Sequence, residues 1–176
     1  MQTMRVPKNK GRRGRPPDES PAASLWRRVD VPSAFAPARQ VEDRILAHCR
    51  RLAYTDRDLF ALKLAIEEAL TNAVRHGNQL DPHKSIHIKY RITPHRADVV
   101  VEDEGGGFNP AALPDPTRNC RLSCAGGRGI LLMRAFMNSV VYNAAGNGVT
   151  LTKFNDAYPR HAGLLKAGSP EKRCYQ

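Results

Sequence analysis

The first half of the chain contains one short apolar stretch followed by two longer segments in which apolar residues recur at helical spacing. Residues 24–31 are predicted to form a strand and residues 35–52 a helix, with Ser33 placed to cap that helix. The apolar side of this helix contains Val41, Ile45 and Leu52. An apolar side with helical spacing faces a core, so both elements are expected to belong to a folded domain.

A second helix is predicted from Thr55 to residues 76–78. The Thr55 hydroxyl can cap its N-terminus, and Asp56 and Asp58 place negative charge in the first turn, where it favours the helix dipole. The apolar positions of this helix share one side: Leu59, Leu62, Ile66, Ala69, Leu70 and Ala73. That side is therefore expected to pack against the core.

The second half of the chain predicts two pairs of strands, separated by a long loop and a third helix. Residues 85–93 and 97–101 are apolar strand segments joined by a short turn, which predicts a β-hairpin. Residues 108–125 are rich in Pro, Asn, Asp and Cys and show no periodicity, as expected of a long functional loop such as a lid. The remaining predicted elements are a helix over residues 127–137 and strands over residues 139–143 and 149–154.

The 176 residues fit one domain with a tail at each end. Residues 1–23 have almost nothing to bury and are predicted to be a disordered basic tail, residues 24–155 form the domain, and residues 156–176 form a loose C-terminal tail. Much of the net charge of +11 comes from residues 1–17, which hold six Lys or Arg and no acidic residue. The rest holds 22 basic and 17 acidic residues, a balance that does not by itself indicate DNA binding.

Composition disfavours several other classes of protein. No apolar run approaches about 18 residues and the N-terminus lacks a secretory signal, so we expect a cytoplasmic protein with no membrane span. The four cysteines have no paired CxxC spacing, which indicates neither a disulfide framework nor a zinc ribbon. Cys120 and Cys124 can be grouped with His83 and His87, but these histidines fall on a predicted turn and strand where their spacing does not suit metal ligands.

On the second predicted helix, Glu68 and Asn72 are four residues apart and share one side, at the edge of the apolar one. A carboxylate there can accept a proton from a hydroxyl or a water molecule. A neutral amide oxygen can ligate Mg²⁺ without adding charge that repels a phosphate. Taken alone, such a pair is more typical of a solvated helix surface.

Two glycine-rich segments complete the candidate site. Asp103 follows an apolar strand and precedes the glycines at 105–107, which let a flat ligand approach the main chain. Its carboxylate suits an exocyclic amine such as that of adenine. Residues 126–129 open a helix whose free amides suit phosphate, and Arg128 adds positive charge. Each segment alone could be a flexible turn, but their fixed order predicts an ATP-binding protein.

The segments EEALTNAVRHGN, VEDEGGGFNP and GGRGILLM resemble the N box and two glycine boxes of the ATPase superfamily shared by gyrase, histidine kinases and mismatch-repair ATPases. The short form with AVRHGN most resembles the anti-sigma-factor serine-protein kinases, over residues 25–154. The resemblance implies the Bergerat ATP-binding fold. This is an α/β two-layer sandwich in which helices cover one face of a mixed, largely antiparallel sheet.

Carried over residue by residue, the resemblance implies that the site binds ATP and Mg²⁺. Glu68 would be the general base, Asn72 the Mg²⁺ ligand and Asp103 the adenine contact. Thr152, or Thr150 beside it, would support Asp103 from the last strand. The remaining ATP-binding residues that the resemblance implies are Gly105, Gly107, Gly127, Arg128 and Gly129.

Kinases of this kind transfer the γ-phosphate of ATP to a serine of an antagonist protein and, in another partner state, bind a sigma factor. The resemblance therefore implies an anti-sigma factor in a partner switch, with a homodimer as the expected assembly. Two alternatives remain open. One is an ATP-binding switch without kinase turnover. The other is a DNA-associated regulator, because residues 13–16 (Arg-Gly-Arg-Pro) in the basic tail resemble the core of an AT-hook.

Overall fold

The computed structural model describes residues 26–110 and 127–158, so the predicted N-terminal tail, most of the predicted C-terminal tail and most of the predicted lid lie outside them. Within these residues, five strands form one sheet in the order β1-β2-β3-β5-β4. The strands are β1 (Arg27–Pro32), β2 (Ser85–Ile92), β3 (Arg96–Asp103), β4 (Ser139–Tyr142) and β5 (Gly148–Phe154). The sequence predicts a mixed, largely antiparallel sheet, and all the neighbouring pairs of these five strands are antiparallel.

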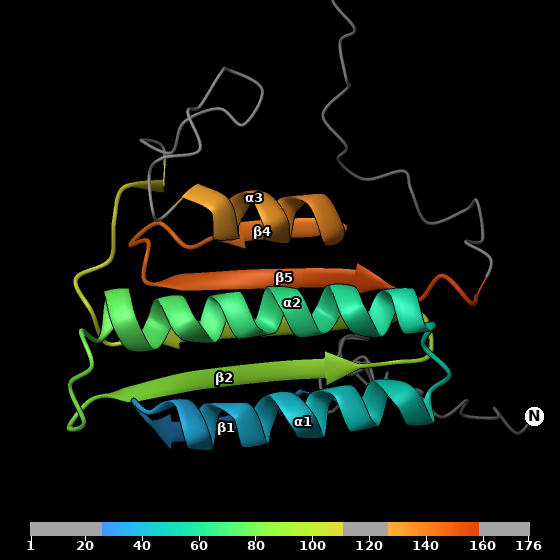
Figure 1. The fold of residues 1–176 in the computed structure, drawn as a ribbon, viewed down its shortest axis with the longest axis horizontal. Helices are drawn as coiled ribbons and strands as arrows, with labels where there is room; N and C mark the ends of the chain where they lie inside the picture. Colours follow the sequence, from blue (N-terminus) through green and yellow to red (C-terminus); the bar gives the residue numbers. More distant parts are fainter. Residues whose placement is uncertain (1–25, 111–126, 159–176) are drawn as a thin grey trace, which may run out of the picture.

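Three helices cover one face of this sheet, as Figure 1 shows: α1 (Phe35–Arg51), α2 (Asp56–Asn72) and α3 (Gly127–Phe136). α2 lies between the other two and continues directly into η2 (Ala73–Gly77), one turn of the wider π-helix. The predicted α/β two-layer sandwich is confirmed. None of the helices in the described residues is long and apolar enough to cross a membrane.

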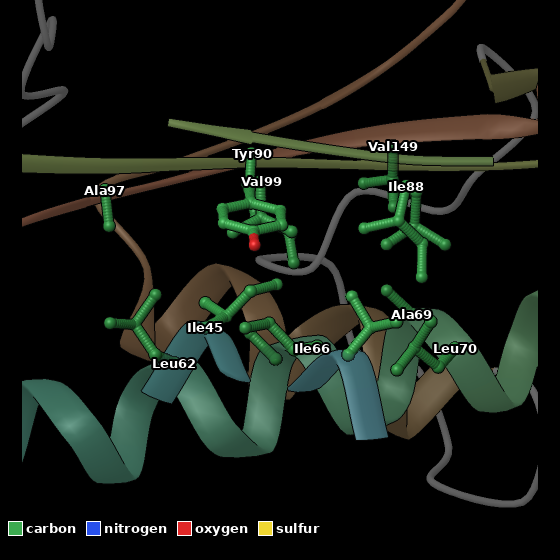
Figure 2. Packing of buried hydrophobic residues seen from close by; sticks show 14 of the residues in the cluster. Ile45, Leu62, Ile66, Ala69, Leu70, Ile88, Tyr90, Ala97, Val99 and Val149 are labelled. Carbon is green, nitrogen blue, oxygen red and sulfur yellow. The ribbon is translucent and has the colours of Figure 1, made fainter. Parts of the chain in front are cut away.

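The core lies between the helices and the sheet (Figure 2). Ile88 and Val99 point from the sheet toward the helices, and Leu62 and Ile66 point back from α2. All four are at most 1% exposed. Successive side chains of a strand point to opposite faces, so one face of each strand is buried here and the other faces away from the helices.

The two long helices begin differently. Thr55 caps α2 as predicted: its Oγ1 accepts the N–H of Asp58 at 3.1 Å, and the Asp58 carboxylate accepts the Thr55 N–H at 3.3 Å. The prediction that Ser33 caps α1 is wrong, because the N-cap residue is Ala34, which makes no side-chain capping bond. Ser33 instead donates its N–H to the Lys84 carbonyl at 2.9 Å, which extends the pairing of β1 by one residue and buries the serine.

Asp58 also ties the start of α2 to the end of β5. Its buried carboxylate lies 2.9 Å from the Nζ atom of Lys153 and accepts the N–H of Asp156 at 3.0 Å. Because both charged groups are almost fully buried, removing either would leave an uncompensated charge in the core. This brace fixes one end of α2 over the sheet, and the candidate site lies toward the other end.

Candidate functional site

A cavity of about 600 Å³ lies between α2 and the sheet. Its walls come from α2 with η2, the loop after β3, the start of α3, and the hairpin of β4 and β5. Ala69, Val101 and Val149 give it apolar surface, while Asn72 and Asp103 contribute polar groups. A concave, mainly apolar space with a few polar groups is the usual form of a small-molecule site.

Asp103 ends β3 at one wall of this cavity. Its Oδ1 accepts the N–H of Gly105 at 2.8 Å, and among the described residues this is the carboxylate's only hydrogen bond. Burial raises the pKa of Asp103, and the bond from Gly105 opposes this only in part. The carboxylate therefore keeps acceptor capacity toward the cavity, which is what a contact to an exocyclic amine requires.

Gly77 and Gly105 pack directly around Asp103. A Cβ atom at Gly77 would overlap the Asp103 carboxylate, and a Cβ atom at Gly105 would overlap the Gly77 carbonyl. Any larger residue at either position would push the end of η2 away from the end of β3. Gly105 is one of the predicted site residues, whereas sequence reasoning used Gly77 only as the end of a helix.

Asn78 joins the end of η2 to the same loop. Its side chain is fully buried, donates from Nδ2 to the Ser85 carbonyl at 2.9 Å, and accepts the N–H of Glu104 on Oδ1 at 2.9 Å. Both amide atoms are therefore satisfied by backbone from β2 and from the loop after β3. Sequence reasoning missed this role, because the backbone groups that Asn78 bonds lie 7 and 26 positions away in the sequence.

Glu68 and Asn72 lie on one side of α2 and are both half-buried, as predicted from their spacing. Asn72 lines the cavity, and the Glu68 carboxylate lies against Gly129 of α3, where a Cβ atom would overlap it. Neighbouring Glu67 points to α1, where its Oε1 lies 3.7 Å from Nη2 of Arg39. The structure thus brings Glu68 together with a residue of the third predicted motif.

The two glycine loops are described to different extents. Gly107 has a left-handed backbone (φ +70°) and lines the cavity. Gly127 and Arg128 lie in the first turn of α3, with Gly129 after them, but the side chain of Arg128 is not described. Residues 111–126, which include most of the predicted lid, are also outside the description.

The prediction that Thr152 or Thr150 supports Asp103 is wrong. Thr152 donates its hydroxyl to Oδ1 of Asp98 at 2.8 Å, five residues before Asp103 on β3. Thr150 pairs with Val100. Asp98 and Val100 alternate with the residues of β3 that face the helices, so both threonines lie on the opposite face of the sheet from Asp103.

Asn147 supports Asp103 instead. Its carbonyl accepts the Asp103 N–H at 2.9 Å and its Nδ2 donates to the Asp103 carbonyl at 2.8 Å. Asn147 lies in the turn between β4 and β5 and itself lines the cavity. The sequence gives no local signal for this contact, because the two residues are 44 positions apart.

Comparison with known sequences identifies relatives. Residues 31–153 match the family model described as the histidine kinase-like ATPase domain. The serine-protein kinase RsbW of Bacillus subtilis is 32% identical over 111 residues, which are 59% of this chain and 69% of that protein. The serine/threonine-protein kinase BtrW of Bordetella bronchiseptica is 33% identical over 97 residues, which cover 53% of this chain and 68% of that one.

A solved structure from Mycobacterium tuberculosis, described as containing RsbU and RsbW domains, has a similar fold. The two match with a TM-score of 0.51 and 18% sequence identity over 74% of this chain. The match spans 31% of the longer chain. At this identity the likeness supports the arrangement of sheet and helices, and the sequence matches carry the relationship.

Proposed function

Since the chain belongs to the histidine kinase-like ATPase family, and within it to the serine-protein kinases that include RsbW, we propose that it transfers phosphate from ATP to a serine of an antagonist protein. In its other partner state it binds a sigma factor as an anti-sigma factor. We further propose that it works as a homodimer in the cytoplasm.

The observation that carries this proposal is that the two ends of the cavity present different polar groups. At one end, Asp103 offers a half-buried carboxylate that accepts a single hydrogen bond from the described residues, with Gly77 and Gly105 packed closely around it. At the helix wall, Asn72 faces the cavity and Glu68 lies one turn earlier on α2. Adenine fits the first position and the phosphates fit the second, near the N-terminus of α3, where helix amides favour anions.

The residues at the helix wall suit phosphate transfer. Asn72 would hold Mg²⁺ through its amide oxygen, and the bound ion would neutralise charge on the phosphates. Glu68 would accept the proton of the serine hydroxyl as the serine oxygen bonds to the γ-phosphorus. The bond from that phosphorus to the bridging oxygen breaks at the same time, which leaves ADP and a phosphoserine.

The neighbouring glutamates provide a matched test of the role of Glu68. Glu68→Gln removes the base, whereas Glu67→Gln makes the same chemical change on the side of α2 that faces α1. With labelled ATP, Mg²⁺ and a candidate antagonist, we expect Glu68→Gln to reduce transfer by about 100-fold or more with ATP affinity retained. Glu67→Gln should behave like the unchanged protein, and full transfer by Glu68→Gln would contradict the assignment.

The same transfer assay distinguishes a serine kinase from an ATP-binding switch without kinase turnover. If the unchanged protein binds ATP but transfers no phosphate to any candidate antagonist, the ATP-binding switch without turnover is the better description. The comparison needs ATP affinity measured beside transfer, because loss of both would point to a failure of the site itself.

A further inference from the structure

The turn between β4 and β5 (residues 143–147) packs against the end of β3 and the loop that follows it (residues 103–108). Asn147 makes two bonds to the backbone of Asp103: its carbonyl accepts the N–H, and its side-chain amide donates to the carbonyl. Both polar backbone groups of Asp103 are therefore held by one residue. The peptide units on either side of the carboxylate cannot rotate without breaking one of these bonds.

The orientation of the Asn147 side chain is fixed by a chain of hydrogen bonds. The N–H of Gly148 donates to Oδ1 of Asn143 at 3.2 Å, and Nδ2 of Asn143 donates to Oδ1 of Asn147 at 2.8 Å. Nδ2 of Asn147 then donates to the Asp103 carbonyl. The chain starts at a group that can only donate and ends at one that can only accept, so neither amide can flip.

Two glycines let the turn and the loop come this close. Gly107 and Gly146 both have left-handed backbones, with φ of +70° and +75°. A Cβ atom at Gly107 would overlap the Ala145 carbonyl, and one at Gly146 would overlap the Phe108 carbonyl. Each glycine therefore makes room for the other segment, so the turn and the loop form one interlocked wall of the cavity.

An aromatic contact joins the same two segments. The rings of Phe108 and Tyr142 meet edge to face with centroids 5.2 Å apart, and both residues line the cavity. Such pairs add to the stability of a contact beyond the area they bury. The wall that carries Asp103 is thus held by backbone bonds, a side-chain relay and a ring pair.

We propose that Asn147 is a positioning residue that fixes Asp103 for the recognition of adenine, and that this relay sets the preference for ATP over nucleotides without the 6-amino group. The inference rests on the proposed function, because it takes Asp103 as the acceptor for that amine. Hydrogen bonds weaken steeply as their geometry departs from linear. If the Asp103 backbone were free to move, the protein would therefore lose its discrimination between bases before it lost its affinity for the phosphates.

The test is Asn147→Asp, which keeps the shape of the side chain but replaces the donor that faces the Asp103 carbonyl. Asn138→Asp is the matched control. Asn138 directly precedes β4, at the end of the hairpin away from the turn, and among the described residues its side chain bonds only through Oδ1, which accepts the Phe154 N–H. Asn147→Ala removes the donor without adding charge. Calorimetric binding of ATP, GTP and inorganic triphosphate, each with Mg²⁺, and the Tm of each variant are measured.

We expect Asn147→Asp and Asn147→Ala to weaken ATP binding by about 10-fold, with GTP and triphosphate binding unchanged, so that the preference for ATP over GTP falls by the same factor. Asn138→Asp should keep the full preference. Equal weakening of all three ligands, accompanied by a lower Tm, would show a merely structural role and overturn the inference.

Failure of the proposed function gives a different result. If the unchanged protein binds no ATP, or binds ATP and GTP equally, the assignment of Asp103 itself is wrong. If the unchanged protein prefers ATP and both Asn147 variants keep that preference, the assignment of Asp103 as the adenine contact is retained and the positioning role of Asn147 is rejected.

Discussion

Strand β3 carries two aspartates, the buried Asp98 and the half-buried Asp103, whose surroundings differ in almost every respect. Asp98 lies on the face of the sheet that no described helix covers, and Asp103 lies on the helix-covered face at the end of the strand. Burial acts on both carboxylates in the same direction, raising the pKa. The difference between them comes from the partners that each has within the protein.

Both carboxylate oxygens of Asp98 accept hydrogen bonds from side chains. Arg91 donates to its Oδ2 at 2.7 Å, while Arg96 and Thr152 donate to its Oδ1 at 2.7 and 2.8 Å. Burial would raise the pKa of Asp98, but these bonds outweigh it and hold the pKa below its ordinary value. Asp103 has one backbone bond and a raised pKa. A carboxylate with three side-chain donors stabilises the fold, whereas one with a single backbone bond at a cavity is available to a ligand.

The largest expected effect follows from removing the Asp98 carboxylate. Asp98→Asn should lower the free energy of unfolding by about 3 kcal/mol, because it leaves two arginines without their shared buried partner. Part of the Arg96 charge is exposed, which keeps the cost near the low end of the range for buried pairs. Urea unfolding measures the change. A loss below about 1 kcal/mol would show that the cluster contributes little.

The second effect concerns binding rather than stability. Asp103→Asn should weaken ATP binding by roughly 10- to 100-fold, because it replaces a charged acceptor for the adenine amine by a neutral amide. Its Tm should be equal to or above that of the unchanged protein, since a poorly compensated, half-buried charge is removed. Calorimetric titration with ATP measures the affinity, and Asp98→Asn is the control. Full ATP affinity in Asp103→Asn would remove the distinction drawn between the two aspartates.

The third effect is in the pH dependence of stability, where the two aspartates should have opposite signs. The folded pKa of Asp98 is depressed, so its stabilisation is present above the unfolded value near 3.8 and is lost as the pH falls through the folded pKa. The folded pKa of Asp103 is raised, so stability is lost as the pH rises from 3.8 through that pKa. When unfolding free energies are measured between about pH 2 and 6, Asp98→Asn should lack the first of these slopes and Asp103→Asn the second. The same slope change in both variants would contradict the comparison.

The smallest effect concerns His87, on the same face as Asp98. Its Nδ1 lies 2.8 Å from Oδ1 of Asp30 and its Nε2 lies 3.3 Å from Oε1 of Glu104, which follows Asp103. The Asp30 bond raises the pKa of His87, so its stabilising effect is present below the unfolded value of 6.5 and lost as the pH rises through the folded pKa. His87→Gln should flatten stability over that window by a small amount, because the groups are partly exposed.

The control for that measurement is His83→Gln, in the turn before β2. It removes one imidazole without touching the bridge between Asp30 and Glu104. If the two variants flatten the pH dependence equally, the bridge has no measurable effect. His87 also shows why sequence grouping of possible metal ligands is unreliable: its two ring nitrogens are engaged with carboxylates on opposite sides.

The fold could be predicted largely from the sequence because its determinants are local. Helical spacing located α1, α2 and α3, and the capping residue Thr55 fixed the start of α2. The prediction failed at Ser33, where the choice between capping a helix and extending a strand depends on Lys84, a residue from another element. Local pattern therefore predicts which elements form, and tertiary pairing decides their ends.

The candidate site was predictable only in part, for the same reason. Asp103 and Gly105 stand out because a carboxylate and glycines follow an apolar strand. Gly77 and Asn147 act on Asp103 from other segments, and nothing near them in the sequence reveals the contact. The error at Thr152 has a similar cause, because the face of the sheet to which a strand residue points depends on its register with the neighbouring strand.

The position of β5 beside β3 has a consequence for the order in which the molecule assembles. The hairpins β2–β3 and β4–β5 join neighbouring segments of the chain, whereas the contact of Asp103 with Asn147 closes a separation of 44 residues. Loop closure over such a distance is entropically costly, so this pairing is expected late in folding. A ligand that bridges the two hairpins would then act on contacts absent from the transition state, slowing unfolding more than it speeds folding.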